Sequence, residues 1–471
     1  MNRPETPAPD PIPAPPTGLG VLLLVGPAFI WCAEYIGSGE VILSTRVGAL
    51  LGPGVAWAIV IGIFLKYWIG MSGARYTACT GEGMMDMFGR MPGPRNWAVW
   101  LVFIVQLAGA VVAIGAVANA AGIFLGALTG LSPVAGAWTV TLFALAVAWT
   151  GIYELLKTVM SLCVAVIVLG VLWVAATVFP GLAAFAPALP DMPAWAVTGF
   201  GANPNPWSEL LPLMGWSAGG FASQVWYTYW VLGAGYGAAA GRDYGKPADE
   251  EMLRTMTPAT AEKIRGWCRV VYADATIAML IGNVVTIGFL VAGAGVLGPA
   301  RQAPQKEQVA IALSALFSER WGATGGNLFL AAAVAALTST LVGILVGWPR
   351  LLSDAVRICV PRAAERVPPK TMARGFLLFF LASNLVMILL VEAGLDPVRL
   401  IKLGAVLDGL LFTPLQALAV GVGLFVVLPR MLPPEARGIL RPHWIFAVGL
   451  AAAFLVFGYF CVVQFPREFV R

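Results

Sequence analysis

Residues 26–44 read GPAFIWCAEYIGSGEVILS, and this stretch decides the fold. It lies within an apolar run, 18–52, that is long enough to cross a membrane, since about 20 mostly apolar residues span the hydrocarbon core. Gly37-Ser38-Gly39 interrupts the run, and an acidic residue lies on each side of the interruption. Glycine weakens a helix, and backbone groups freed inside a bilayer must meet protein, ions or water. The pattern predicts two half-helices that meet at a polar site.

A second apolar run has the same character. Residues 215–230 read GWSAGGFASQVWYTYW and lie within the sixth run, 209–238. Small residues also allow helices to pack closely, but two glycine clusters five helices apart, each with polar neighbours, favour broken helices. A transporter built from a five-plus-five inverted repeat has interrupted helices at these central positions. The sequence therefore predicts an all-α polytopic membrane protein with helices one and six broken.

The composition agrees with a membrane protein and excludes several other classes. The 471 residues are 59% hydrophobic and only 11% charged, whereas soluble proteins carry about 25% charged residues. A single histidine, His443, and six scattered cysteines do not form a zinc motif or a disulfide framework. The basic residues fall between apolar runs and give no indication of nucleic-acid binding. The sequence does not indicate an oligomeric state.

The chain divides into three parts by composition. Residues 1–17 are rich in proline and predict a disordered cytoplasmic tail. Residues 18–430 form the predicted ten-helix transporter core, and residues 431–471 hold an eleventh helix with a short C-terminal tail. The eleven predicted membrane spans are roughly 18–52, 54–78, 96–127, 132–150, 152–179, 209–238, 270–298, 325–348, 372–393, 398–429 and 443–464.

The positions of lysine and arginine predict the orientation. Most of the 29 basic residues lie on one side if the N-terminus is cytoplasmic, and the long connection 180–208 has none. Cytoplasmic loops carry the excess of basic residues. We therefore expect a multi-pass protein of the bacterial inner membrane, with its N-terminus inside and its C-terminus outside.

Among the ionisable residues inside the predicted spans, five are candidates for a buried site: Glu34, Glu40, Lys66, Asp274 and Asp408. Such residues are costly in a membrane and usually face a cavity or each other. Glu40 is a candidate cation ligand, or it compensates the positive N-terminal end of a half-helix. Asp408 is a ligand or proton carrier, or it makes a structural hydrogen bond. Glu34 faces the same cavity or pairs with Lys66.

Several polar and backbone groups complete the candidate site. Ser38 supplies a hydroxyl ligand or caps the second half-helix. Backbone groups at Gly37 and Ala218, with the side chains of Ser223 and Gln224, are candidates for the rest of a cation shell; an interhelical hydrogen bond is the alternative for Gln224. Asp274, Asn283 and Lys66 are candidates for gating or for a proton path. The alternative for Asp274 is an acidic residue that lies at the membrane interface without a gating role.

These segments resemble the Nramp metal-ion transporters, which have a LeuT-type fold. The pair Gly26-Pro27 matches the start of that family's first-helix motif, so that 37–40 stands in its Asp-Pro-Gly-Asn slot. The segments GARYTACTGE (73–82), SAGGFASQ (217–224) and DATIAMLIGNVV (274–285) resemble its second, sixth and seventh helices. The resemblance implies a transporter whose metal ion is a substrate, with no cofactor, and no enzyme activity.

The substitutions in the motifs modify this expectation. Gly37 stands in the slot of the family's metal-binding Asp, Glu40 in that of its Asn, and Phe221 lies near the slot of its sulfur-bearing Met. Hard oxygen ligands suit Mg²⁺ or Mn²⁺ rather than Zn²⁺ or Cu²⁺. The third span (96–127) lacks the acidic residues of the family's proton path, which predicts weak or absent proton coupling.

An alternative is an amino-acid or amine transporter of the wider superfamily. The segment 36–39, Ile-Gly-Ser-Gly, also resembles the motif with which amino-acid permeases bind a substrate carboxylate. Glu40 beside this segment repels a carboxylate and attracts a cation, which favours the metal interpretation. An intramembrane enzyme is disfavoured, because the sequence contains no HExxH motif and no pair of carboxylates at helical spacing within one span.

Overall fold

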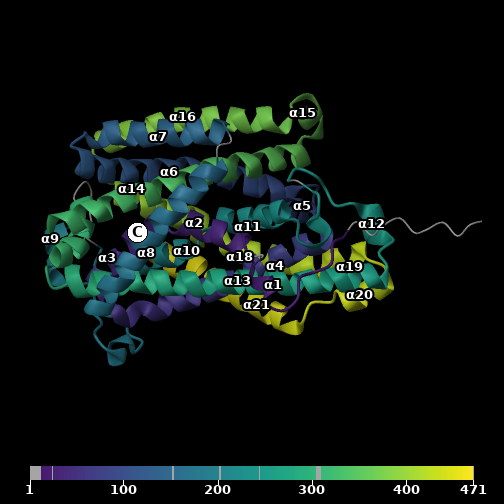
Figure 1. The fold of residues 1–471 in the computed structure, drawn as a ribbon, viewed down its shortest axis with the longest axis horizontal. Coiled ribbons are helices and arrows are strands. Elements are labelled where there is room, and N and C mark those ends of the chain that lie inside the picture. Colours follow the sequence, from purple (N-terminus) through teal and green to yellow (C-terminus); the bar gives the residue numbers. More distant parts are fainter. Residues whose placement is uncertain are drawn as a thin grey trace, which may run out of the picture.

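The computed structural model describes residues 12–23, 25–150, 153–200, 203–242, 244–303 and 309–469. Over these residues the regular structure is entirely helical. Figure 1 shows an elongated bundle in which the long helices run side by side along one axis. The predicted all-α class is confirmed.

The membrane-spanning elements follow the predicted runs. In the described part of the chain, seven helices are long and apolar enough to cross a membrane, α7 and α8 are shorter apolar helices, and two spans are broken. The other spans are α4 (Ala56–Thr80), α6 (Trp97–Thr129), α7 (Pro133–Thr150), α8 (Tyr153–Thr177), α13 (Pro258–Ala292), α14 (Val309–Cys359), α16 (Pro369–Glu392), the run of α17 (Pro397–Gly404), η7 (Ala405–Leu410), α18 (Thr413–Val422), η8 (Gly423–Val427) and α19 (Leu428–Met431), and α21 (Trp444–Tyr459). Helix α14 has a kink at Gly322, where φ is 64° and ψ is −163°.

Both broken helices lie where the glycine clusters predict them. The first consists of α2 (Pro27–Tyr35), a π-helical turn η1 (Gly39–Ser44) and α3 (Thr45–Leu51). The second consists of α10 (Trp207–Trp216) and α11 (Phe221–Ala234).

The break of the second helix requires an unusual backbone. Ala218 and Gly219 have φ of 56° and 76°, in the left-handed region. Glycine adopts this region freely, whereas a residue with a Cβ does so at a cost of about 1–2 kcal/mol. The strained backbone at Ala218 therefore needs support from another part of the protein. The side chain of Glu40 in the first broken helix supplies it by accepting a hydrogen bond from the N–H of Ala218.

Buried ion pairs tie the helices together at both ends of the bundle. At one end, Glu209 of α10 pairs with Arg46 of α3 at 2.8 Å and with Lys402 of α17 at 2.7 Å. At the other end, near α5 (Met84–Gly89), Arg357 pairs with Asp86 at 2.7 Å and with Asp354 at 3.0 Å. The breaks lie between these two networks.

Several helix boundaries differ from the prediction, including both ends of α14 (Val309–Cys359), whose span was predicted as 325–348. Helix α13 begins at Pro258 rather than at residue 270, because Thr257 caps it through the backbone N–H of Thr260 and proline suits a first helical position. Pro13, within the predicted disordered tail, packs against this extension and accepts a 2.9 Å hydrogen bond from Trp267 Nε1. The rest of that tail, 1–11, lies outside the described residues.

The chain ends at the opposite end of the bundle from Pro13. Beyond α21, the helix continues through η9 (Phe460–Gln464) to α22 (Phe465–Phe469), which contacts α10. Figure 1 marks the C-terminus on the side of α3 and α9 (Ala194–Phe200), away from α12 (Glu250–Arg254) and α15 (Pro361–Arg366).

Candidate functional site

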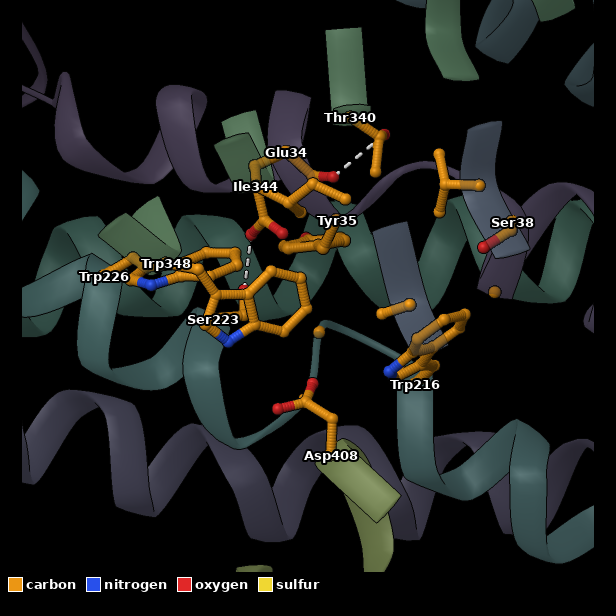
Figure 2. A pocket seen from close by; sticks show the side chains of 15 residues that line it. Glu34, Tyr35, Ser38, Trp216, Ser223, Trp226, Thr340, Ile344, Trp348 and Asp408 are labelled. Atoms are coloured by element: carbon orange, nitrogen blue, oxygen red, sulfur yellow. Dashed lines mark hydrogen bonds between the residues drawn. The ribbon is translucent and has the colours of Figure 1, made fainter. Parts of the chain in front are cut away.

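A cavity of about 40 Å³ lies where the two broken helices meet. Its walls come from the breaks in α2–η1 and α10–α11 and from α6, α14 and η7. Figure 2 shows Glu34 and Asp408 entering it from opposite sides. Of the predicted site residues, Ser38 and Ser223 also line it. The structure therefore brings together four candidates from three separate stretches of sequence.

Glu34 is held against the second broken helix. Its Oε2 accepts a 2.5 Å hydrogen bond from the hydroxyl of Ser223, and that hydroxyl accepts a 2.8 Å bond from Trp31 Nε1. The backbone carbonyl of Glu34 accepts a 3.0 Å bond from the hydroxyl of Thr340 on α14. Figure 2 draws both contacts of Glu34. This chain of donors orients the carboxylate toward the cavity.

Asp408 occupies the opposite wall, on the π-helical turn η7. Its Oδ1 accepts a 3.1 Å hydrogen bond from the backbone N–H of Ala222, in the first turn of α11. A Cβ built on Gly220 would lie 1.8 Å from the Oδ2 of Asp408. The glycine is therefore what lets this carboxylate approach the helix break. The structural hydrogen bond predicted for Asp408 is present, and the same carboxylate also faces the cavity.

Glu40 joins the two breaks to each other. Its Oε1 accepts a 3.2 Å hydrogen bond from the N–H of Ala218, and its Oε2 a 3.4 Å bond from the N–H of Gly37. The side chain is fully buried and does not line the cavity. Glu40 thus supports the strained backbone at Ala218 and pairs with buried backbone N–H groups at both breaks, which agrees with the second of its two predicted roles. Its role as a cation ligand stays a prediction.

Lys66 of α4 contacts the break of the second helix. Its Nζ donates to the carbonyl oxygens of Gly215, Ser217 and Gly219 at 2.5, 3.0 and 2.8 Å. An ammonium has three N–H donors, so all of them are used by these carbonyls. The predicted alternative in which Glu34 pairs with Lys66 is therefore wrong.

The remaining candidates lie outside the cavity lining. Gln224 Nε2 donates to the Ala218 carbonyl at 3.5 Å, which is a contact within its own helix break rather than the predicted interhelical bond. Asp274 accepts a 2.7 Å bond from the Tyr227 hydroxyl. Asn283 donates to the carbonyl of Met279 in its own helix at 3.0 Å. The gating roles of Asp274, Asn283 and Lys66 stay predictions.

The predicted ligands do not form one compact cluster in this conformation. Within the described residues, no group of three or more His, Cys, Asp and Glu side chains is placed to hold a metal ion. The reason is that Glu40 turns toward backbone N–H groups, which leaves two carboxylates facing the cavity. The hydroxyl of Ser38 makes no cap contact with η1, and Ser38 lines the cavity.

Sequence reasoning missed much of the cavity wall. Trp216, Trp226 and Trp348 line it, and the last two pack edge to face at a centroid distance of 5.0 Å. Thr340 lines it as well and holds the backbone of Glu34. The polar triplet Thr-Ser-Thr at 338–340 inside an apolar run is the signal that could have indicated α14.

The sequence matches known proteins only locally. No protein-family model matches the chain. It is 32% identical over 81 residues to the divalent metal cation transporter MntH of Yersinia enterocolitica, which is 17% of this chain and 20% of that protein. The match thus spans a fifth of the length of this curated relative.

Solved structures match over nearly the whole chain. The manganese transporter of Eremococcus coleocola, in complex with an aromatic bis-isothiourea substituted compound, aligns with a TM-score of 0.60 and 17% identity, over 96% of this chain and 89% of that one. MhsT in complex with L-phenylalanine aligns with a TM-score of 0.54 and 13% identity, over 94% and 99%. These matches confirm the predicted fold: the chain has the LeuT-type fold of these proteins.

Proposed function

We propose that this chain is an Nramp-related transporter that carries a divalent cation through the cavity between its broken helices. One observation carries the proposal. Three buried carboxylates, Glu34, Glu40 and Asp408, surround the breaks, and one buried ammonium, Lys66, lies among them. When all four are ionised, two negative charges remain. Buried charges are stable only when they are compensated, and one divalent cation compensates both.

The ligand chemistry supports a hard cation. The side-chain groups of the lining that can bind a metal ion are all oxygen ligands: the carboxylates of Glu34 and Asp408 and the hydroxyls of Tyr35, Ser38, Ser223 and Thr340. No cysteine, methionine or histidine is among the lining residues. Oxygen ligands suit Mg²⁺ and Mn²⁺, whereas Zn²⁺ and Cu²⁺ favour nitrogen and sulfur. The similar proteins include a manganese transporter and a divalent metal cation transporter, which agrees with this class.

The α6 wall supports weak or absent proton coupling. This helix faces the cavity with Ala113 and Val117, and no acidic side chain of α6 lines it. We place the protein in the bacterial inner membrane with its N-terminus cytoplasmic, as the distribution of basic residues indicates.

Uptake by purified protein in proteoliposomes tests the proposal. We expect saturable uptake of Mn²⁺ or Mg²⁺, with little acidification reported by an internal pH dye, and loss of uptake in Glu34→Gln, which keeps an acceptor for Ser223 but removes the charge. The matched control is Glu435→Gln, the same change at an exposed position. Equal uptake by both variants, or no uptake of any divalent ion by folded parent protein, contradicts the proposal.

A second candidate is an organic cation such as an amine. The three tryptophans of the cavity wall favour it, because aromatic faces attract ammonium groups. In the same vesicles, amine uptake that depends on Glu34 without uptake of divalent ions would select this alternative.

A further inference from the structure

Lys66 is a buried charged residue at the second helix break, and packing alone does not require a charge at this position. It belongs to α4, an unbroken helix, and its side chain is 1% exposed. Its Nζ lies 2.5–3.0 Å from three carbonyl oxygens, and all three belong to five consecutive residues of the second broken helix, 215–219. The ammonium thus occupies the point at which these carbonyls converge.

Carbonyls that converge in this way form a cation site. They come from the C-terminal end of α10, where the helix dipole is negative. Rings of backbone carbonyls replace the hydration shell of an alkali cation in channels, and unwound helix ends coordinate cations in transporters. In this chain a side-chain ammonium, rather than an ion from solution, makes those contacts.

The charges around the ammonium agree with this role. Asp408 and Glu40 are the two acidic groups that interact electrostatically with Lys66. Asp408 binds the N–H of Ala222 at the start of α11, and Glu40 binds that of Ala218 within the break. The ammonium therefore compensates one of the negative charges at the break and, through the carbonyls, holds the end of α10.

We propose that Lys66 is a built-in monovalent cation, whose ammonium fills a carbonyl site at the second helix break that an inorganic or organic monovalent cation would otherwise occupy. The parent protein then needs no bound monovalent ion to hold this break. Only the uptake measurement described with this inference rests on the proposed function. The carbonyl site itself is formed by the backbone of the second helix break, whatever the protein transports.

The test opens the site and asks whether a monovalent cation fills it. Lys66→Ala removes three carbons and the ammonium, the atoms of n-propylammonium, whereas Lys66→Met fills most of the same space without charge. In detergent at constant ionic strength, Na⁺, K⁺ and n-propylammonium are each titrated against N-methylglucamine. We expect at least one of them to raise the melting temperature of Lys66→Ala saturably, by about 2 °C or more, and none to raise that of Lys66→Met or of the parent.

Three outcomes overturn the inference. The first is a Lys66→Ala variant that responds to no monovalent cation, and the second is one that responds no more than Lys66→Met. The third is a parent protein that Na⁺ or K⁺ stabilises saturably. If Lys66→Ala does not fold, the parent decides the question, since its melting temperature must be the same in N-methylglucamine as in Na⁺.

In proteoliposomes, divalent uptake by the parent must be unchanged between these buffers, within about twofold. Absence of all divalent uptake argues against the proposed function and leaves the stability test of Lys66 intact.

Discussion

Asp408→Asn is expected to abolish uptake of the divalent cation while leaving the protein folded. The substitution keeps the shape of the side chain and an oxygen that accepts the hydrogen bond from Ala222 N–H, which is 3.1 Å long in the parent. It removes one of the two negative charges that the cation compensates and one of the two carboxylates that face the cavity. We expect the affinity for Mn²⁺ or Mg²⁺ to fall at least tenfold, which is about 1.4 kcal/mol.

The measurement is radiotracer or dye-reported uptake, together with the melting temperature of each variant. Asp249→Asn is the matched control, because Asp249 is an exposed N-cap of α12 and asparagine caps a helix equally well. Uptake that survives in Asp408→Asn would show that the cation does not pass this carboxylate. A loss of folded protein in Asp408→Asn would show instead that the charge holds the helix break.

Gly409→Ala is expected to produce the largest loss of stability. Helix α10 and the turn η7 approach each other through glycines, and a Cβ on Gly409 would lie 1.8 Å from the carbonyl oxygen of Gly215 and 2.3 Å from its carbonyl carbon. Both atoms belong to the backbone, so a side-chain rearrangement cannot relieve the clash. Overpacking of this kind costs about 3 kcal/mol, and we expect a melting temperature lower by about 5 °C or little folded protein.

Gly421→Ala is the control for this substitution. Gly421 lies in α18 of the same span, and a Cβ there would meet only Leu450 Cδ1, at 3.9 Å. Alanine favours a helix over glycine by about 0.5–1 kcal/mol, so this variant should be at least as stable as the parent. Two variants with equal melting temperatures would contradict the close approach of α10 and η7.

The sequence predicted the breaks because glycine and polar residues inside an apolar run carry a strong local signal. The clusters at 37–39 and 215–220 place both breaks correctly. The start of α13 was missed, since Thr257-Pro258 is a good helix start that lies outside the apolar run used to define the span. Apolar length marks what crosses a membrane, and capping residues mark where the helix begins.

The partners of the buried charges could not be predicted in the same way. Glu34 and Lys66 are both buried and of opposite charge, yet one binds the hydroxyl of Ser223 and the other binds backbone carbonyls. Which of these pairs forms depends on the three-dimensional path of the chain at 215–219, because the carbonyls that Lys66 binds converge only there. The tryptophans of the cavity wall were missed for a related reason: an apolar aromatic residue gives the same signal whether it packs in the core or lines a cavity.

The most direct test is to locate the cation. Crystals of the parent protein grown with Mn²⁺ should show an anomalous scattering peak between the carboxylates of Glu34 and Asp408, within ligand distance of both, and crystals of Asp408→Asn should lose it. A Mn²⁺ peak bound elsewhere, for example at Asp274 or at the Asp86–Arg357 network, with none in the cavity, would contradict the central claim that the cation binds between the two broken helices.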